Sequence, residues 1–249
     1  MILCLDAGNT RLKWGLWDGR DWRGSGALDH AGSGQLIDAL PTRPSRILAC
    51  NVAGDGVAAS IVTLAASLSV PLDWFVSSAA AGGVGNGYDN PAQLGADRWA
   101  ALIGARSVHD GPALVVMSGT ATTIDVLGAD GVFRGGLILP GLDLMHQALA
   151  RNTARLPAAR GRYSTSPTNT DDAIVSGCLF ATLGAIERMA RCSFDDVAGT
   201  NFCCLVSGGG ADALVPHLSM PHARIDNLVL TGLARISAAH EALEAREVS

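Results

Sequence analysis

Three short polar turns, each directly after an apolar run, carry the side chains best suited to chemistry: residues 6–10 (DAGNT), 118–122 (SGTAT) and 207–210 (SGGG). Glycine in such turns lets the main chain approach an anion closely, and successive N–H groups can point at phosphate oxygens. Asp6 ends the first apolar run, where a carboxylate can hold Mg²⁺ through water. Any one of these turns could be an ordinary turn that only ends a strand. Together they predict a site for a phosphate-bearing nucleotide.

Two of these turns are related by an internal repeat. Residues 6–10 align with residues 117–121 (MSGTA), and both follow an apolar run and precede a hairpin that ends in Asp-Gly. Asp-Gly is a strong signal for a tight hairpin turn. The repeated strand–turn–strand unit predicts two similar lobes, which we place at residues 1–110 and 111–249.

The segments around these turns resemble, in chain order, those of the type III pantothenate kinase family, part of the acetate kinase/sugar kinase/Hsp70/actin superfamily. Residues 6–13 and 118–125 resemble its two phosphate motifs, and residues 88–91 (YDNP) with 94–98 (LGADR) resemble its pantothenate-binding segment. The remaining matches are residues 135–141, 169–177 and the glycine turn 208–210. Each piece is short, but their order from residue 6 to residue 210 makes the combination specific.

The resemblance implies a role for each matched position. The expected ATP-binding residues are Asp6, Ala7, Gly8, Asn9, Thr10, Arg11, Leu12, Lys13 and Thr120, and Asp6 is also expected to bind Mg²⁺ through water. The expected pantothenate-binding residues are Tyr88, Gly95, Ala96, Asp97, Arg98 and Thr170. Asp97 is expected to be the general base that accepts the proton of the primary hydroxyl during attack on the γ-phosphate.

Several of these residues also have purely structural interpretations. Asp97 stands at the start of a predicted helix, where aspartate is a common N-cap, and Thr170 could cap the helix that follows it. Lys13 could be a solvated strand residue. The neighbouring Tyr88 and Arg98 favour the catalytic interpretation of Asp97, and the planar fork of Arg98 suits an anion or amide oxygens.

One position departs from the family pattern. In many members the second phosphate motif begins with an aspartate that helps to bind a monovalent cation, K⁺ or NH₄⁺, and here that position is Met117. A thioether is not a hard oxygen ligand. Asp125 stands on the other side of the predicted turn, so it is no simple replacement. The resemblance therefore implies Mg²⁺ but leaves the monovalent cation in question.

Apolar periodicity and turn residues predict an α/β protein. The expected strands are 2–5, 12–17, 46–51, 72–76, 114–117, 123–127, 132–137 and 202–206, with a loop at 79–87. The expected helices are 57–69, 97–108, 142–155, 170–191, 211–217 and 227–245. The resemblance implies two actin-like (ribonuclease H-like) lobes, each a mixed five-stranded sheet with flanking helices, and ATP in the cleft between them. It also implies a homodimer, for which residues 135–145 and 170–191 are the expected contact surfaces.

Composition excludes several other classes. Of the 249 residues, 48% are hydrophobic and the net charge is −5, with no basic run of the kind that binds nucleic acid. We expect no membrane span, because the apolar runs are short and interrupted. The six cysteines form no CxxC pair, so we expect buried, reduced thiols that pack as small apolar residues in a cytoplasmic protein.

The predicted reaction is the ATP-dependent conversion of pantothenate to 4′-phosphopantothenate, the first step of coenzyme A biosynthesis. The alternative from another class is a non-catalytic accessory factor in transcription, because some proteins that resemble this family were first described that way. A third possibility is a kinase for another small hydroxy acid or sugar. A regulator would have no physical need for Asp6, Tyr88, Asp97, Arg98 and Thr120 together, so we favour the enzyme.

Overall fold

The chain folds into two compact units. In this computed structural model residues 1–152, 161–194 and 201–247 are described, with the main chain alone for 31–33, 152 and 239–247. The first unit contains Met1–Asp110, Gly131–Phe133 and the residues from Asn227 onward, and the second contains Gly111–Asp130 and Arg134–Asp226. The expected second lobe, 111–249, thus includes a helix that packs with the first unit.

That helix, α7 (Leu228–Glu247), packs against α3 (Ala96–Val108). The contact depends on small residues, because a Cβ atom added at Gly232 would lie 1.9 Å from the carbonyl oxygen of Ala100. The two helix backbones therefore approach more closely than larger residues allow. This close packing explains why the C-terminal helix belongs with the first unit.

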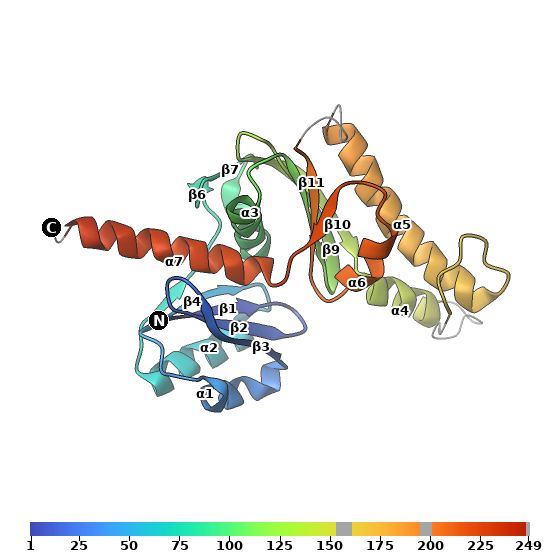
Figure 1. Cartoon of the computed structure of the whole chain (residues 1–249). Helices are drawn as coiled ribbons and strands as arrows, with labels where there is room; N and C mark the ends of the chain where they lie inside the picture. Colours follow the sequence, from blue (N-terminus) through green and yellow to red (C-terminus); the bar gives the residue numbers. More distant parts are fainter. Residues whose placement is uncertain (153–160, 195–200, 248–249) are drawn as a thin grey trace. The chain divides into compact units, whose positions relative to one another are not determined.

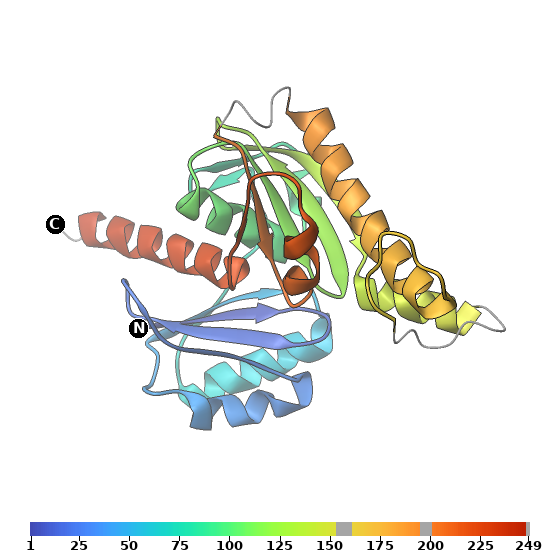
Figure 2. The same cartoon turned by 45° about the vertical axis from the view of Figure 1, so that its right-hand side comes forward.

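The first unit is built on a five-stranded mixed sheet of order β3-β2-β1-β4-β5 (Figure 1). The strands are β1 (Ile2–Ala7), β2 (Leu12–Trp17), β3 (Trp22–Leu28), β4 (Arg46–Asn51) and β5 (Leu72–Trp74). Strand β1 is antiparallel to β2 and parallel to β4. Helices α1 (Leu36–Ala39) and α2 (Asp55–Leu68) cover one face of this sheet (Figure 2), and α3 and α7 contact its strands as well.

Alternation along β1 divides its side chains between two environments. Leu3, Leu5 and Ala7 belong to the apolar core under α1 and α2. Cys4 and Asp6 therefore point to the opposite face of the sheet. The same alternation applies to β4, where Ile47 and Ala49 belong to that core. A single carboxylate at the end of β1 is thus directed away from the main apolar core of its unit.

A second sheet repeats this topology and extends it. Its order is β12-β11-β8-β9-β10-β7-β6. The strands are β6 (Ala80–Ala81), β7 (Val84–Asn86), β8 (Ala113–Ser118), β9 (Ala121–Leu127), β10 (Val132–Pro140), β11 (Cys203–Ser207) and β12 (His222–Arg224). Strand β8 is antiparallel to β9 and parallel to β11, as β1 is to β2 and β4. Five strands match the expected repeat, and the short strands β7 and β6 make the total seven instead of five.

The core of the second unit lies between strands β8, β9 and β11 and two helices. These are α5 (Thr170–Ser193) and α6 (Ala211–Leu214), and the short α4 (Leu142–Asn152) contacts α5. By length and composition α5 could span a membrane, since an 18-residue window reaches a mean hydropathy of 1.4, but 44% of that window is buried inside the fold. A core helix passes the same test, and α5 supplies four residues to this core: Leu179, Leu183, Ile186 and Ala190.

Most predicted elements lie within a few residues of their expected bounds. The exceptions are the strands β3 and β12, helix α1 with the turn of helix before it, the short helical turn Pro91–Gln93, and β6 with β7, which were expected to be a loop. Glycine-rich β3 and the two-residue β6 lack the apolar alternation that identifies a strand, and their pairing depends on neighbours distant in the chain. Residues 153–155 of the expected helix 142–155 lie outside the described residues.

Candidate active site

The buried carboxylate of Asp6 is the centre of the candidate site in the first unit. Its side chain is 6% exposed, and burial raises its pKa to about 6. Lys13 opposite it on β2 lowers that pKa, and the charge of Asp97 raises it. The charge of Asp97, which the sequence predicts to be the base, thus acts on Asp6.

Cys50 completes this group. It lies opposite Asp6 on β4, and its Sγ donates a hydrogen bond of 3.7 Å to Oδ1 of Asp6. Burial, together with the charges of Asp6 and Asp97, raises the pKa of Cys50 well above its usual value. The thiol stays protonated and can act only as a donor to the carboxylate. Sequence reasoning assigned Cys50 only a packing role, and it missed this contact because the two residues are paired across strands.

Asp97 lies in the first turn of α3, and it is not the N-cap. The N-cap is Gly95, and Oδ1 of Asp97 instead accepts a hydrogen bond of 2.8 Å from the main-chain N–H of Arg98. A Cβ atom at residue 95 would lie 2.7 Å from that Oδ1. Glycine at residue 95 therefore leaves the space that the Asp97 carboxylate occupies. The capping interpretation of Asp97 is wrong, and its half-buried carboxylate is available for other chemistry.

Arg98 and Tyr88 form a pair beside this carboxylate. Nη1 of Arg98 donates to the Tyr88 hydroxyl at 3.1 Å, and the guanidinium carbon lies 5.8 Å from the Tyr88 ring centroid. Arg98 is 6% exposed, although it is a full positive charge. A buried guanidinium needs partners. The Tyr88 hydroxyl and ring supply part of that compensation, and they fix the direction of the planar fork.

A groove of about 430 Å³ adjoins the start of α3. Its lining comes from the ends of β4 and β5 and from the segment before α3, and it includes Asn51, Trp74, Phe75, Ser77, Gly95 and Ala96. Most of the lining is apolar, while the buried Ser77 hydroxyl has no hydrogen-bond partner in the structure. Two of the residues expected to contact the substrate, Gly95 and Ala96, thus line a concave surface of the first unit.

The first phosphate motif divides into core and exposed residues. Ala7 and Leu12 are buried in the core, so only their main-chain groups can reach a ligand. The turn between them is closed by a 3.2 Å hydrogen bond from the Gly8 N–H to the Arg11 carbonyl, and Asn9, Thr10 and Arg11 are exposed. Nε2 of His30 lies 2.9 Å from the Gly8 carbonyl oxygen. No sequence pattern connects His30 with this turn.

In the second unit, two of the predicted turns pack against each other. The N–H of Gly210 donates to the Ser118 carbonyl at 3.0 Å, and a Cβ atom at Gly208 would lie 2.2 Å from the same oxygen. Gly208 has a φ of +97°, which favours glycine. Thr120 is exposed at the tip of the β8–β9 turn, and its carbonyl accepts from the Gly141 N–H at 2.9 Å.

Thr170 is not a helix cap. The N-cap of α5 is Asn169, whose side chain accepts a hydrogen bond of 2.9 Å from the Asp172 N–H. Thr170 is the exposed first residue of the helix, so its hydroxyl has no capping task.

Comparison with known proteins decides the family. A sequence model of the family described as "Type III pantothenate kinase" matches residues 2–192. The chain belongs to the type III pantothenate kinase family. It is 53% identical to the type III pantothenate kinase of Aromatoleum aromaticum over 239 residues, covering 95% of this chain and 98% of that protein. It is 48% identical to the type III pantothenate kinase of Herminiimonas arsenicoxydans, covering 95% and 97% of the two chains.

Solved structures extend the likeness to the fold. A Campylobacter jejuni protein assigned to the Baf family of transcriptional activators superposes with a TM-score of 0.63 and 20% identity, covering 96% of this chain and 99% of its own. The activator of the 2-hydroxyisocaproyl-CoA dehydratase from Clostridium difficile, solved with bound ADPNP, superposes with a TM-score of 0.57 and 12% identity, covering 100% and 97%. At these identities the likeness shows the actin-like ATPase and sugar kinase fold alone.

Membership of the type III pantothenate kinase family implies a divalent metal cofactor. Within the described parts of the chain, no group of three or more His, Cys, Asp or Glu side chains could hold a metal ion. Mg²⁺ is usually bound by one or two carboxylates together with substrate phosphates, so the buried Asp6 carboxylate fits such an ion. Met117 is half-buried and pairs with Ser207 and Thr123, while Asp125 is fully buried on β9.

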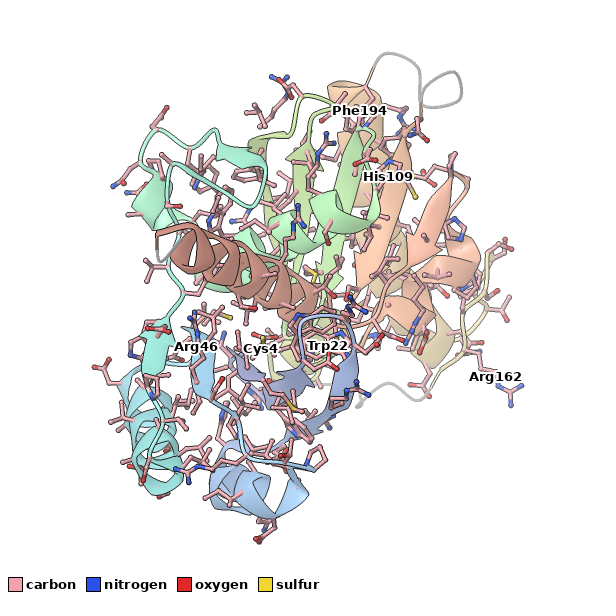
Figure 3. All side chains as sticks on the ribbon, turned by 60° about the vertical axis from the view of Figure 1, so that its left-hand side comes forward. Cys4, Trp22, Arg46, His109, Arg162 and Phe194 are labelled. Carbon is pink, nitrogen blue, oxygen red and sulfur yellow. The ribbon has the colours of Figure 1, made fainter. Side chains whose placement is uncertain are left out.

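The cysteines of the first sheet are unsuited to redox chemistry. Cys4 lies on β1 and Arg46 on the neighbouring strand β4 (Figure 3). Burial raises the pKa of Cys4 to about 12, an effect that the charge of Arg46 only partly offsets. A thiol that stays protonated is a poor nucleophile and a poor metal ligand. Cys4 therefore acts as a small apolar residue, as the sequence predicted.

Proposed function

We propose that this chain is an ATP-dependent kinase that phosphorylates pantothenate to 4′-phosphopantothenate, the first step of coenzyme A biosynthesis. The observation that carries the proposal is the first turn of α3, where Asp97 stands beside the Arg98–Tyr88 pair and near Asp6. This turn occurs in a chain that is 53% identical to a curated type III pantothenate kinase over nearly its full length.

The roles of these residues follow from their chemistry. Pantothenate carries a primary hydroxyl at one end and a carboxylate at the other. Asp97 accepts the hydroxyl proton as the oxygen attacks the γ-phosphorus and ADP leaves, because a positioned carboxylate can act as a general base. Arg98 and Tyr88 bind the anionic or amide part of the substrate, and the groove lined by Gly95 and Ala96 accepts its chain.

The two phosphate motifs bind the nucleotide. Asp6 would hold Mg²⁺ through water, and Lys13 with the main-chain groups of residues 8–11 would bind phosphate. Thr120 contributes from the second motif, and Thr170 contacts pantothenate. A bound magnesium ion neutralises charge on the phosphate oxygens, which is its usual contribution to phosphoryl transfer. The side chain of Met117 supplies no hard oxygen for K⁺ or NH₄⁺, so a monovalent cation would need main-chain carbonyls and another group as ligands.

An accessory role in transcription is not favoured. The curated relatives at 41–53% identity are all described as type III pantothenate kinases. A panel of small hydroxy acids and sugars tests the remaining alternative, a kinase of other specificity. ADP formation that is faster with any of them than with pantothenate would contradict the proposed substrate.

We further propose that the enzyme is a cytoplasmic homodimer that binds neither nucleic acid nor membranes. In the second unit, every large apolar side chain that is described as exposed lies on β10, α4 or α5: Leu137, Ile138, Leu144, Leu149 and Phe180. These elements overlap the surfaces expected from the sequence, residues 135–145 and 170–191. Exposed apolar side chains that gather on neighbouring elements support a contact with a second copy.

The general base is tested with Asp97→Asn. The amide oxygen of asparagine can accept the same hydrogen bond from the Arg98 N–H, so the first turn of α3 should persist. We expect kcat to fall by about 100-fold or more, while pantothenate binding changes little. Steady-state ADP formation measures the first quantity, and isothermal titration calorimetry measures the second.

The matched control is Asp38→Asn, which removes an exposed carboxylate in the first turn of α1. It should leave kcat within about twofold. Normal turnover in Asp97→Asn would show that this carboxylate is not the base.

A further inference from the structure

Two aromatic rings, and not one, contact the guanidinium of Arg98. Its carbon lies 5.8 Å from the ring centroid of Tyr88 and 5.9 Å from that of Phe133. The two rings contact each other, with centroids 5.1 Å apart and planes tilted by 45°. The three side chains form a closed group in which each one touches the other two. Tyr88 and Arg98 are proposed substrate residues, whereas Phe133 has no assigned role.

The main chain holds Phe133 firmly in this group. Residues 132 and 133, at the start of β10, pair with residues 85 and 86 of β7. The Gly87 N–H donates to the Phe133 carbonyl at 2.9 Å, directly before Tyr88. Asn86 restrains the main chain of Tyr88, since its Oδ1 accepts a hydrogen bond from the Tyr88 N–H at 3.1 Å. The short strands β6 and β7, which the sequence did not predict, thus connect Phe133 to the substrate segment.

Because both side chains are buried, the ring of Phe133 is important for stabilising the positive charge of Arg98. Phe133 is fully buried and Arg98 is 6% exposed, so water does little to solvate the guanidinium. A cation near an aromatic ring face within about 6 Å is attracted by the ring quadrupole, most strongly where both are desolvated. The ring also occupies space into which Tyr88 or Arg98 could otherwise rotate.

We propose that Phe133 is a positioning residue that holds Arg98 and Tyr88 in the orientation that binds the anionic or amide part of pantothenate. This inference rests on the proposed function. The described ring contacts of Phe133 are with Arg98 and Tyr88, so we expect its effect mainly on substrate binding. Without the ring, Arg98 and Tyr88 sample more rotamers, and substrate binding must then restrict them at an entropic cost.

The test is Phe133→Leu, which keeps an apolar side chain but removes the ring. We expect the KM for pantothenate to rise by about 3- to 30-fold, with kcat and the KM for ATP within about threefold of their original values. The matched control is Phe202→Leu in the core of the second unit, where Phe202 is 3% exposed and packs on Phe194. Phe202→Leu should lower the Tm without a selective change in the KM for pantothenate.

A second substitution covers the case in which Phe133→Leu does not fold. Incorporation of 3,5-difluorophenylalanine at position 133 keeps the ring and its shape but weakens its negative face. We expect a smaller, selective rise in the KM for pantothenate at an unchanged Tm.

The outcomes separate this inference from the proposed function. An unmodified chain that does not phosphorylate pantothenate overturns the proposed function and the inference with it. An active chain whose KM for pantothenate is the same in Phe133→Leu and in the fluorinated protein overturns the inference alone. Equal rises in both KM values would assign Phe133 a structural role only, which also overturns it.

Discussion

At the scale of single residues, the buried Asp6 carboxylate, which we propose to bind the metal, lowers the stability of the fold when it is ionised. Burial raises its pKa from 3.8 to about 6, against the attraction of Lys13. The folded state therefore binds a proton more tightly than the unfolded state does. Stability falls as pH rises from about 4 to about 6, and above pH 6 the ionised carboxylate costs on the order of 3 kcal/mol. A bound magnesium ion and nucleotide would offset this cost.

Asp6→Asn tests that balance. In metal-free buffer we expect its Tm to exceed that of the unmodified enzyme at pH 8, with the difference shrinking towards pH 4, where Asp6 is already neutral. Activity should fall by about 100-fold, because the amide cannot replace a carboxylate beside the proposed metal. Thermal melts across this pH range and ADP formation at pH 8 provide the measurements. A Tm advantage that does not change with pH would contradict the raised pKa.

At the scale of elements, the position of Asp97 depends on how α3 is held. Its first turn begins at the N-cap Gly95, and its middle packs against α7 through the contact of Gly232 with Ala100. A helix fixed at both places keeps a carboxylate in its first turn within a small range of positions. The packing of the C-terminal helix is therefore part of the support of the proposed site.

Gly232→Ala tests how much the packing of α3 against α7 contributes to stability. The added methyl group meets the Ala100 carbonyl oxygen, so the helices must separate, and we expect a loss of about 1–3 kcal/mol in the free energy of unfolding. Gly184→Ala in α5 is the control, because a Cβ there meets nothing within 4 Å. That substitution should stabilise the helix by about 0.5–1 kcal/mol. Urea denaturation distinguishes the two, and equal effects of the same sign would refute the close packing of α3 and α7.

At the scale of the whole molecule, the two units share a strand topology but differ in which elements carry their exposed apolar side chains. Each contains the same arrangement of five strands, but the described exposed apolar side chains of the second unit gather on β10, α4 and α5. The first unit carries Asp6, Asp97 and Arg98, and the second carries Thr120 and Thr170. The elements of the proposed contact include α5, which also carries Thr170, so this helix has a part in both proposals.

The proposed homodimer gives a prediction at this scale. Ile138 is 66% exposed on β10, and Ile138→Glu would bury a charge in the proposed contact. Light scattering after gel filtration should give twice the chain mass for the unmodified protein and a shift towards the single chain mass for this variant. Val62→Glu, at a 51% exposed position on α2, should stay dimeric. A monomeric unmodified protein would rule out the dimer.

The sequence by itself determined most of the elements, the repeat and the family, and it predicted the residues of the phosphate and substrate motifs. These depend on local properties: apolar runs form strands, Asp-Gly forms hairpins, and motifs keep their spacing along the chain. Only the tertiary structure decided that Asp97 is no cap, that α7 belongs with the first unit, and that Cys50 and Phe133 contact Asp6 and Arg98. Those contacts join residues 44 and 35 positions apart, by strand pairing and packing that no local pattern encodes.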